Sequence, residues 1–229
     1  MYKVVYFRKY NYYVNFVEIL PYYFLKSKSF SYLCTRITKY KLYMQKKIHD
    51  IAFIRSGAYL KEGVSEDVGY LQVNDYNKAE NRFVLPRPSL ELNDKTKKHL
   101  LMEGDILLAA KGASNFCVVY HEDTGKAVAS SSFLVISVID GNIVSPDYLC
   151  WVLNREDTLA FFKANAVGSS MPSITKTWVE AYEIAIPPIQ TQKKIIEISR
   201  LQQQEQRLYR QISELRNQLI QKQLIKLLQ

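Results

Sequence analysis

The fold of this chain is decided by one stretch near its end, Ala185-Ile186-Pro187-Pro188-Ile189-Gln190-Thr191-Gln192-Lys193-Lys194-Ile195. Before the prolines, Ile184 and Ile186 alternate with Ala185 as the residues of a strand do, and proline is well tolerated where a helix starts. From Ile189 to Gln229 the chain has neither proline nor glycine, which predicts a helix of 41 residues, about 60 Å long. The stretch therefore indicates a strand-containing body that ends at the proline pair and a long helix that begins there.

An apolar seam runs along the predicted helix. Its residues are spaced at steps of three, four or seven and are separated by Gln, Arg and Glu; they are Leu201, Leu208, Ile212, Leu215 and Leu219. This spacing is typical of a coiled coil, which buries such a seam only against a partner helix. We expect residues 189–229 to serve in dimerisation, spacing and partner binding. The alternative is a long helix folded back on its own body.

Composition places the chain among ordinary globular proteins. Its 229 residues are 48% apolar and 23% charged, enough for one good-sized core and an appendage, and no segment approaches a membrane span. The cysteines Cys34, Cys117 and Cys150 are odd in number and widely separated, and no histidine lies near them at metal-ligand spacing. These features predict three buried thiols, a reducing cytoplasmic location and no metal site.

The net charge of +9 is unevenly distributed along the chain. Residues 1–43 hold eight basic residues and one acidic residue, and residues 189–229 hold eight and three. The middle, residues 44–188, keeps 15 basic and 18 acidic residues. If the middle binds DNA, it must therefore do so through a local patch, because its overall charge is negative.

Residues 1–43 differ from the rest of the chain. They contain ten of the seventeen tyrosines, follow no steady helix or strand period, and show no secretory signal. We interpret them as an atypical, weakly ordered extension that precedes a functional start at Met44. The alternative is a basic aromatic arm for nucleic acid, since stacking rings between lysines suit single strands.

The body, residues 44–188, reads as short alternating elements. Strands that end in a turn are expected at residues 68–75 and 82–85, and further strands at residues 106–110, 116–120 and 127–138. A helix is expected from Pro146 to Leu153, with Ser145 as its N-cap and Asp147 in its first turn. This order predicts an α+β fold: a curled, mostly antiparallel domain followed by the long C-terminal helix.

Several pieces follow one another in an order that is fairly specific as a set. They are Ile54-Arg55-Ser56-Gly57, Gly69-Tyr70-Leu71-Gln72-Val73-Asn74-Asp75, Gly104-Asp105-Ile106-Leu107-Leu108 with Lys111-Gly112, Ser145-Pro146-Asp147-Tyr148-Leu149 with Leu153, Gly168-Ser169-Ser170-Met171-Pro172-Ser173-Ile174, and Ile184-Ala185-Ile186-Pro187-Pro188 with Gln192 and Ile195. Through them the body resembles the target-recognition domain of the specificity subunits of type I restriction-modification systems. The resemblance covers residues 44–229 and leaves residues 1–43 unmatched.

The resemblance implies a subunit without catalytic activity that reads double-stranded DNA for its partners. A modification subunit would methylate adenine with S-adenosylmethionine, and a restriction subunit would use ATP and Mg²⁺, so no cofactor is expected in this chain. The sequence agrees, because it contains neither an adenine-methyltransferase signature nor a phosphate-binding Gly-x-x-x-x-Gly-Lys-Ser/Thr loop.

The chain departs from the family pattern in one respect. Family members usually carry two recognition domains and two long helices, whereas this chain has one of each. Two copies would then pair through their helices and read two half-sites at a spacing set by helix length. The alternatives are a truncated or silent cassette, a recognition fragment of a fused methyltransferase or restriction enzyme, and a coiled-coil protein without a DNA role.

Two loops combine small, polar and basic residues beside strand ends and are the candidate DNA contacts. Their residues are Lys111, Gly112, Ser114 and Asn115 in the first loop, and Ser169, Ser170, Ser173, Thr175 and Lys176 in the second. Hydroxyls, backbone N–H groups beside glycine and lysines suit phosphate contacts. Asn115 would read an adenine edge, and Arg55, Lys61 or Arg82 would reach guanine. The alternative for each is a solvated loop side chain.

Overall fold

The computed structural model describes residues 43–61, 63, 67–77, 82–83, 88–112, 114–168 and 172–227, without the side chains of Arg82 and Pro88. Apart from Tyr43, the expected weakly ordered extension over residues 1–43 therefore lies outside the described residues. The expected DNA contacts of Ser169 and Ser170 lie outside them too.

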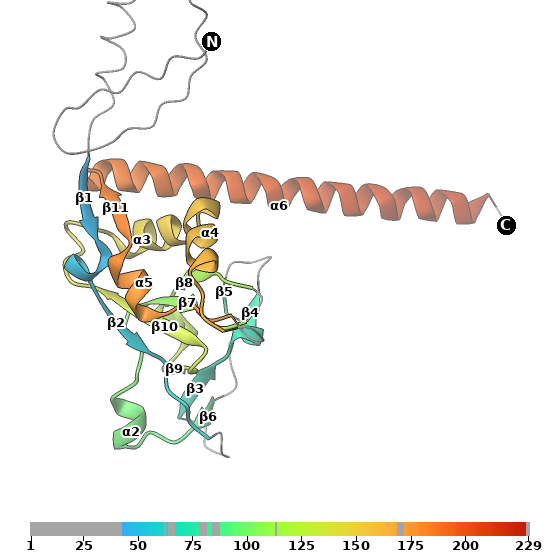
Figure 1. The fold of residues 1–229 in the computed structure, drawn as a ribbon. Helices are drawn as coiled ribbons and strands as arrows, with labels where there is room; N and C mark the ends of the chain where they lie inside the picture. Colours follow the sequence, from blue (N-terminus) through green and yellow to red (C-terminus); the bar gives the residue numbers. More distant parts are fainter. Residues whose placement is uncertain are drawn as a thin grey trace, which may run out of the picture. The chain divides into compact units, whose positions relative to one another are not determined.

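Short strands and short helices alternate along the body, and one long helix follows (Figure 1). The strands are β1 (Met44–Lys47), β2 (Ala52–Ser56), β3 (Val68–Leu71), β4 (Tyr76–Asn77), β5 (Arg82–Phe83), β6 (Pro88–Leu90), β7 (Ile106–Ala109), β8 (Cys117–Val119), β9 (Ala127–Ala129), β10 (Phe133–Val138) and β11 (Glu183–Ile186). The helices are α2 (Asp94–Lys97), α3 (Pro146–Leu153), α4 (Glu156–Ala164), α5 (Lys176–Ala181) and α6 (Ile189–Lys226), with 3-10 turns η2 (Ile48–Asp50), η3 (Val73–Asp75) and η4 (Glu122–Thr124). This mixture confirms the predicted α+β class.

The main sheet has four strands in the order β2-β10-β7-β8, and every neighbouring pair is antiparallel. At its centre, Ile136 of β10 lies opposite Ile54 on one side and Ile106 on the other. Strands β7 (Ile-Leu-Leu-Ala) and β10 (Phe-Leu-Val-Ile-Ser-Val) are almost continuous apolar runs rather than alternating patterns. Such runs suit a sheet that is covered on both faces, and the alternate residues of β7 do lie in two different core clusters.

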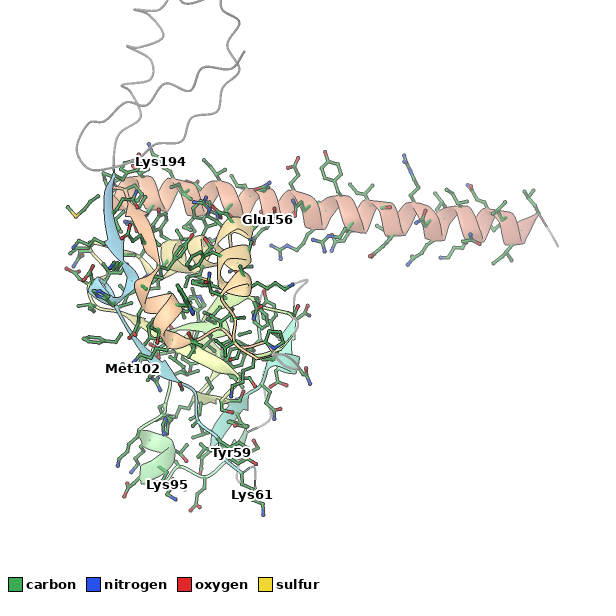
Figure 2. All side chains as sticks on the ribbon, viewed as in Figure 1. Tyr59, Lys61, Lys95, Met102, Glu156 and Lys194 are labelled. Atoms are coloured by element: carbon green, nitrogen blue, oxygen red, sulfur yellow. The ribbon has the colours of Figure 1, made fainter. Side chains whose placement is uncertain are left out.

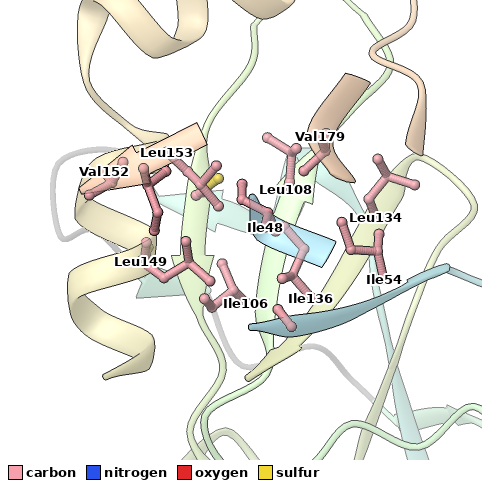
Figure 3. Packing of buried hydrophobic residues seen from close by; sticks show 14 of the residues in the cluster. Ile48, Ile54, Ile106, Leu108, Leu134, Ile136, Leu149, Val152, Leu153 and Val179 are labelled. Carbon is pink, nitrogen blue, oxygen red and sulfur yellow. The ribbon is translucent and has the colours of Figure 1, made fainter. Parts of the chain in front are cut away.

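Helices cover one face of the main sheet and form the larger core (Figure 3). Leu149 and Leu153 of α3, Val179 of α5 and Ile48 of η2 pack there with side chains of β7 and β10. Each fully buried aliphatic side chain of this kind stabilises the fold by about 1.5–3 kcal/mol. The predicted α3 is confirmed with its cap, because Ser145 Oγ accepts a hydrogen bond of 3.1 Å from the Tyr148 N–H.

The second sheet corrects one prediction, since residues 127–138 are two strands and not one. Strand β9 pairs in parallel with β3, in the order β6-β3-β9, whereas β10 belongs to the main sheet. The break falls at residues 130–132, where Gly57 crosses the chain so closely that an added Cβ would lie 2.1 Å from the Ser130 carbonyl oxygen. The Gly57 N–H donates to the Phe133 carbonyl at 2.9 Å. The chain therefore bends from one sheet into the other because Gly57, which is distant in sequence, crosses it there. No local sequence signal marks the bend.

The long helix α6 begins at Ile189, where the proline pair predicts it. Just before it, β11 pairs with β1, so that Met44 lies opposite Ile186. Near its start α6 lies against α3, and Ile195 and Ile196 pack on the larger core. From Arg200 to Leu227 every residue is exposed. The described part of the chain therefore does not show the helix folded back on its own body.

Candidate functional site

The two loops predicted to contact DNA are brought together by backbone hydrogen bonds. Lys111 forms an antiparallel bridge with Ser173, and the Ile174 N–H donates to the Ala110 carbonyl at 2.8 Å. Within the second loop, Val167 and Ser173 exchange hydrogen bonds of 3.1 and 2.9 Å. We call the joined surface the paired-loop site; its described members are Lys111, Gly112, Ser114, Asn115, Val167, Gly168, Ser173, Thr175 and Lys176.

Two glycines give the paired-loop site its turn geometry. Gly112 has φ +101° and Gly168 has φ +111°, in the region that glycine adopts without strain. No heavy atom lies within 4 Å of the position that a Cβ of Gly112 would occupy. A side chain at this position would therefore meet no neighbour within the described protein, but its backbone conformation would be strained.

Lysine supplies the positive charge of the paired-loop site. Lys111 is exposed, and Lys176 stands at the first position of α5 with about half of its side chain exposed. The Lys176 ammonium lies 3.5 Å from a carboxylate oxygen of Glu180. Both partners of this pair are substantially exposed, and such pairs are worth little because solvent screens them. Lys176 is therefore able to exchange Glu180 for a phosphate at small cost.

Asn115 is half-buried, and its amide is engaged within its own loop. Its Nδ2 donates a hydrogen bond of 2.8 Å to the Ala109 carbonyl, which closes the turn between β7 and β8. Next to it, the ring of Phe116 stacks on that of Tyr76, with centroids 3.9 Å apart and planes at 12°. Burial raises the pKa of Tyr76 to about 12. Asn115 thus has a structural role in the turn, and its contact with adenine stays a prediction.

Arg55 has a structural role in the body, and its contact with guanine stays a prediction. Its guanidinium donates to the Leu100 carbonyl at 3.0 Å, the His99 carbonyl at 3.3 Å and the Asp105 carboxylate at 3.2 Å. Asp105 is itself buried and also accepts from Ser137 Oγ at 2.6 Å. The sequence shows the positive charge of Arg55 but not this partner, which lies 50 residues away.

The other two residues expected to reach guanine are Lys61 and Arg82, and the structure describes only the side chain of Lys61. Lys61 is exposed and lies in the part of the body farthest from α6 in Figure 2, as does Lys95. None of the bridges and hydrogen bonds that join the described residues of the paired-loop site involves Lys61. The side chain of Arg82 lies outside the described residues.

Asn154 helps to position the paired-loop site, although nothing in the sequence indicates this role. Its Oδ1 accepts from the Cys117 N–H and its Nδ2 donates to the Cys117 carbonyl, both at 2.7 Å. The side chain thus acts as a strand partner for β8, directly after the first loop. In sequence, Asn154 reads only as the residue that ends α3, because Cys117 is 37 residues away.

Neither metal ligands nor a membrane span stands out in the part of the chain that the structure describes. No three His, Cys, Asp or Glu side chains there come together to hold a metal ion. No described helix combines the length and the apolar character needed to cross a bilayer. Cys117 and Cys150 are buried free thiols.

Comparison with known proteins assigns the chain to a family. The family model for the type I restriction modification DNA specificity domain matches residues 40–219. The chain belongs to this family. The match covers the paired-loop site and most of α6, and it favours a specificity domain over a methyltransferase fragment or a coiled-coil protein without a DNA role.

Individual relatives agree with the family assignment. The Type I restriction enzyme HindI specificity subunit of Haemophilus influenzae is 32% identical over 104 residues, which are 44% of this chain and 22% of that protein. The S subunit of a type I restriction-modification system from M. genitalium has a TM-score of 0.50 at 12% identity, over 68% of this chain and 37% of that one. The HsdS subunit from Thermoanaerobacter tengcongensis has a TM-score of 0.52 at 15% identity, over 74% and 39%. At these identities the solved structures show a shared fold, and this specificity domain spans less than half the length of each relative.

Proposed function

We propose that this chain reads DNA sequence for a type I restriction-modification complex and directs adenine methylation and restriction by its partner subunits. The observation that carries the proposal is the family match, because it runs through both the body and the long helix. The paired-loop site supports the DNA-reading part, since it gathers exposed lysines, hydroxyls and glycine backbone on one surface.

The chain contributes recognition and no catalysis in this proposal. A separate modification subunit supplies the methyl transfer from S-adenosylmethionine, and a restriction subunit supplies the ATP- and Mg²⁺-dependent step. This chain itself holds no cofactor. It acts in the cytoplasm, where its DNA substrate and its partner subunits are found.

Assembly in this proposal uses the apolar seam of α6, formed by Leu201, Leu208, Ile212, Leu215 and Leu219. These five side chains are between 51% and 64% exposed, and Figure 2 shows the far half of α6 extending past the body with no other described element drawn beside it. An apolar seam of this length favours a partner helix. A second copy of this chain supplies that helix, and the pair presents two recognition bodies to two half-sites.

Binding to a random duplex library, in the presence of the modification subunit, tests the proposed function. Repeated selection and sequencing should enrich one motif with two half-sites at a fixed spacing. A library that stays unenriched would contradict DNA reading. Light scattering on the same sample tests assembly separately, because a strictly monomeric specificity chain would contradict pairing through α6.

A further inference from the structure

Gln192 is the one fully buried residue of α6. Its relative exposure is 0%, whereas the neighbouring Gln190, in the same turn, is exposed. A buried amide is costly unless its hydrogen-bonding groups are paired. The hydrogen bonds of Gln192 therefore show which segments hold the first turns of α6, which we call the root of the helix.

Three hydrogen bonds of Gln192 join the start of α6 to two other segments. Its Oε1 accepts from the Ser145 N–H at 2.9 Å, and its Nε2 donates to the carbonyls of Ile143 and Pro187, each at 2.8 Å. Both amide hydrogens and one oxygen lone pair are thus used. Ile143 and Ser145 precede α3, and Pro187 joins β11 to α6, so one side chain ties the helix to both.

Other contacts also hold the root of α6 against the body. Tyr148 of α3 donates its hydroxyl hydrogen to the Ala185 carbonyl of β11 at 2.8 Å. Ile195 and Ile196, one turn beyond Gln192, pack on the larger core. Beyond Ser199 the helix has no buried residue among those described, so the direction of the whole exposed part depends on this root.

The length of the exposed part makes its direction sensitive to small changes. From Arg200 to Lys226 the helix extends for about 40 Å at the usual rise per residue. A swing of about 10° at the root would move its far end by about 7 Å, which equals about two base pairs of B-DNA. A helix that sets a spacing therefore needs a fixed root.

We propose that Gln192 is a positioning residue that locks the root of α6 to the body and thereby fixes the spacing between the two DNA half-sites. The effect on spacing rests on the proposed function, whereas the lock itself does not. Gln192→Met keeps the length of the side chain and removes all three hydrogen bonds. Gln190→Met makes the same change in the same turn at an exposed position and is the matched control.

Distance distributions between two spin labels test the lock without DNA. The labels are placed at Lys126→Cys in the body and Asn217→Cys on α6, both exposed, with Cys34 replaced by serine and labelled chains diluted with unlabelled ones. We expect one narrow distribution for the wild-type chain and for Gln190→Met. For Gln192→Met we expect a broader distribution, by about 4 Å for every 10° of swing, because the label at residue 217 lies about 25 Å beyond Arg200. An unchanged Gln192→Met distribution would overturn the lock. A wild-type distribution that is already broad would overturn it as well, even if Gln192→Met fails to fold.

Duplexes with different spacers between the half-sites test the effect on spacing, with the modification subunit present. The wild-type chain and Gln190→Met should prefer one spacer length, and Gln192→Met should accept spacers that differ by about two base pairs. A broadened distance distribution with unchanged spacer preference would overturn the role in spacing. A wild-type chain that binds no duplex would contradict the proposed function instead, and the distances would still test the lock.

Discussion

Removal of both lysines from the paired-loop site should weaken DNA binding for every sequence. Lys111 is exposed, and Lys176 forms a solvent-screened pair with Glu180 at 3.5 Å. Lys111→Ala with Lys176→Ala should therefore change the free energy of unfolding by no more than about 0.5 kcal/mol for each substitution. Any large loss of DNA affinity then reports on binding and not on folding.

The expected size of the effect follows from counterion release. If each lysine neutralises one phosphate, the slope of log affinity against log salt should fall by about 1.8. Between about 50 and 200 mM salt, the wild-type protein should then lose about twelvefold more affinity than the double variant. Fluorescence anisotropy with a target duplex and with an unrelated duplex, each at several salt concentrations, measures this slope.

The matched control removes two exposed lysines, one within α2 and one directly after it, in the part of the body farthest from α6 (Figure 2). Lys95→Ala with Lys98→Ala changes the net charge by the same amount at exposed positions. The control should keep the wild-type slope. The reasoning is refuted if the paired-loop variant keeps the wild-type slope, or if both double variants lose it equally.

Three further predictions concern assembly, stability and the thiols. Leu208→Asp with Leu215→Asp should abolish self-association measured by light scattering and leave the thermal midpoint of the body unchanged, because both side chains are more than half exposed; retained self-association would contradict pairing through the α6 seam. Asn154→Ala should lower the free energy of unfolding by about 1–3 kcal/mol in urea titrations, because it leaves the Cys117 backbone groups unpaired. Asn165→Ala removes a hydrogen bond at the exposed end of a helix and should lower the free energy of unfolding by less. Burial raises the pKa of the Cys117 thiol well above its ordinary value and that of Cys150 to about 12, so iodoacetamide at about pH 8.5 should label both thiols only after unfolding; rapid labelling of the native chain would contradict their burial. The free energy of unfolding should also fall as the pH rises past the ordinary thiol pKa, because the unfolded state then releases protons that the folded state retains.

Features with local causes are the ones that the sequence predicts well. The start of α3 depends on Ser145 and that of α6 on the proline pair, and each signal lies within a few residues of the helix that it begins. The α6 seam is likewise a pattern within one helix, and its side chains are exposed in the structure. In these cases the chain needs no distant partner to form the element.

Features that depend on distant partners are not predicted. The break between β9 and β10 depends on the close approach of Gly57, and β1 exists only because it pairs with β11. Similarly, the sequence gives no sign that Arg55 bonds to Asp105, because the two residues are far apart along the chain. The short helix α4 begins after Arg155, which is not a capping residue type, and Thr175 before α5 makes no capping hydrogen bond.

The candidate site is predicted in its parts and not in its arrangement. Loop composition singles out Lys111 and Lys176, but only the bridge between Lys111 and Ser173 shows that the two loops form one surface. Asn154 has no sequence signal for its role, because its two bonds to Cys117 appear only when α3 lies beside β8. The contact residues therefore follow from topology as much as from residue type.

Methylome sequencing tests the central claim most directly. Cells that carry the modification subunit are compared with and without this chain, and with the Lys111→Ala, Lys176→Ala variant. The account predicts one methylated adenine motif with two half-sites, present with the wild-type chain, lost without it and reduced in the variant. A methylome that is identical with and without the chain would contradict the claim that it directs methylation.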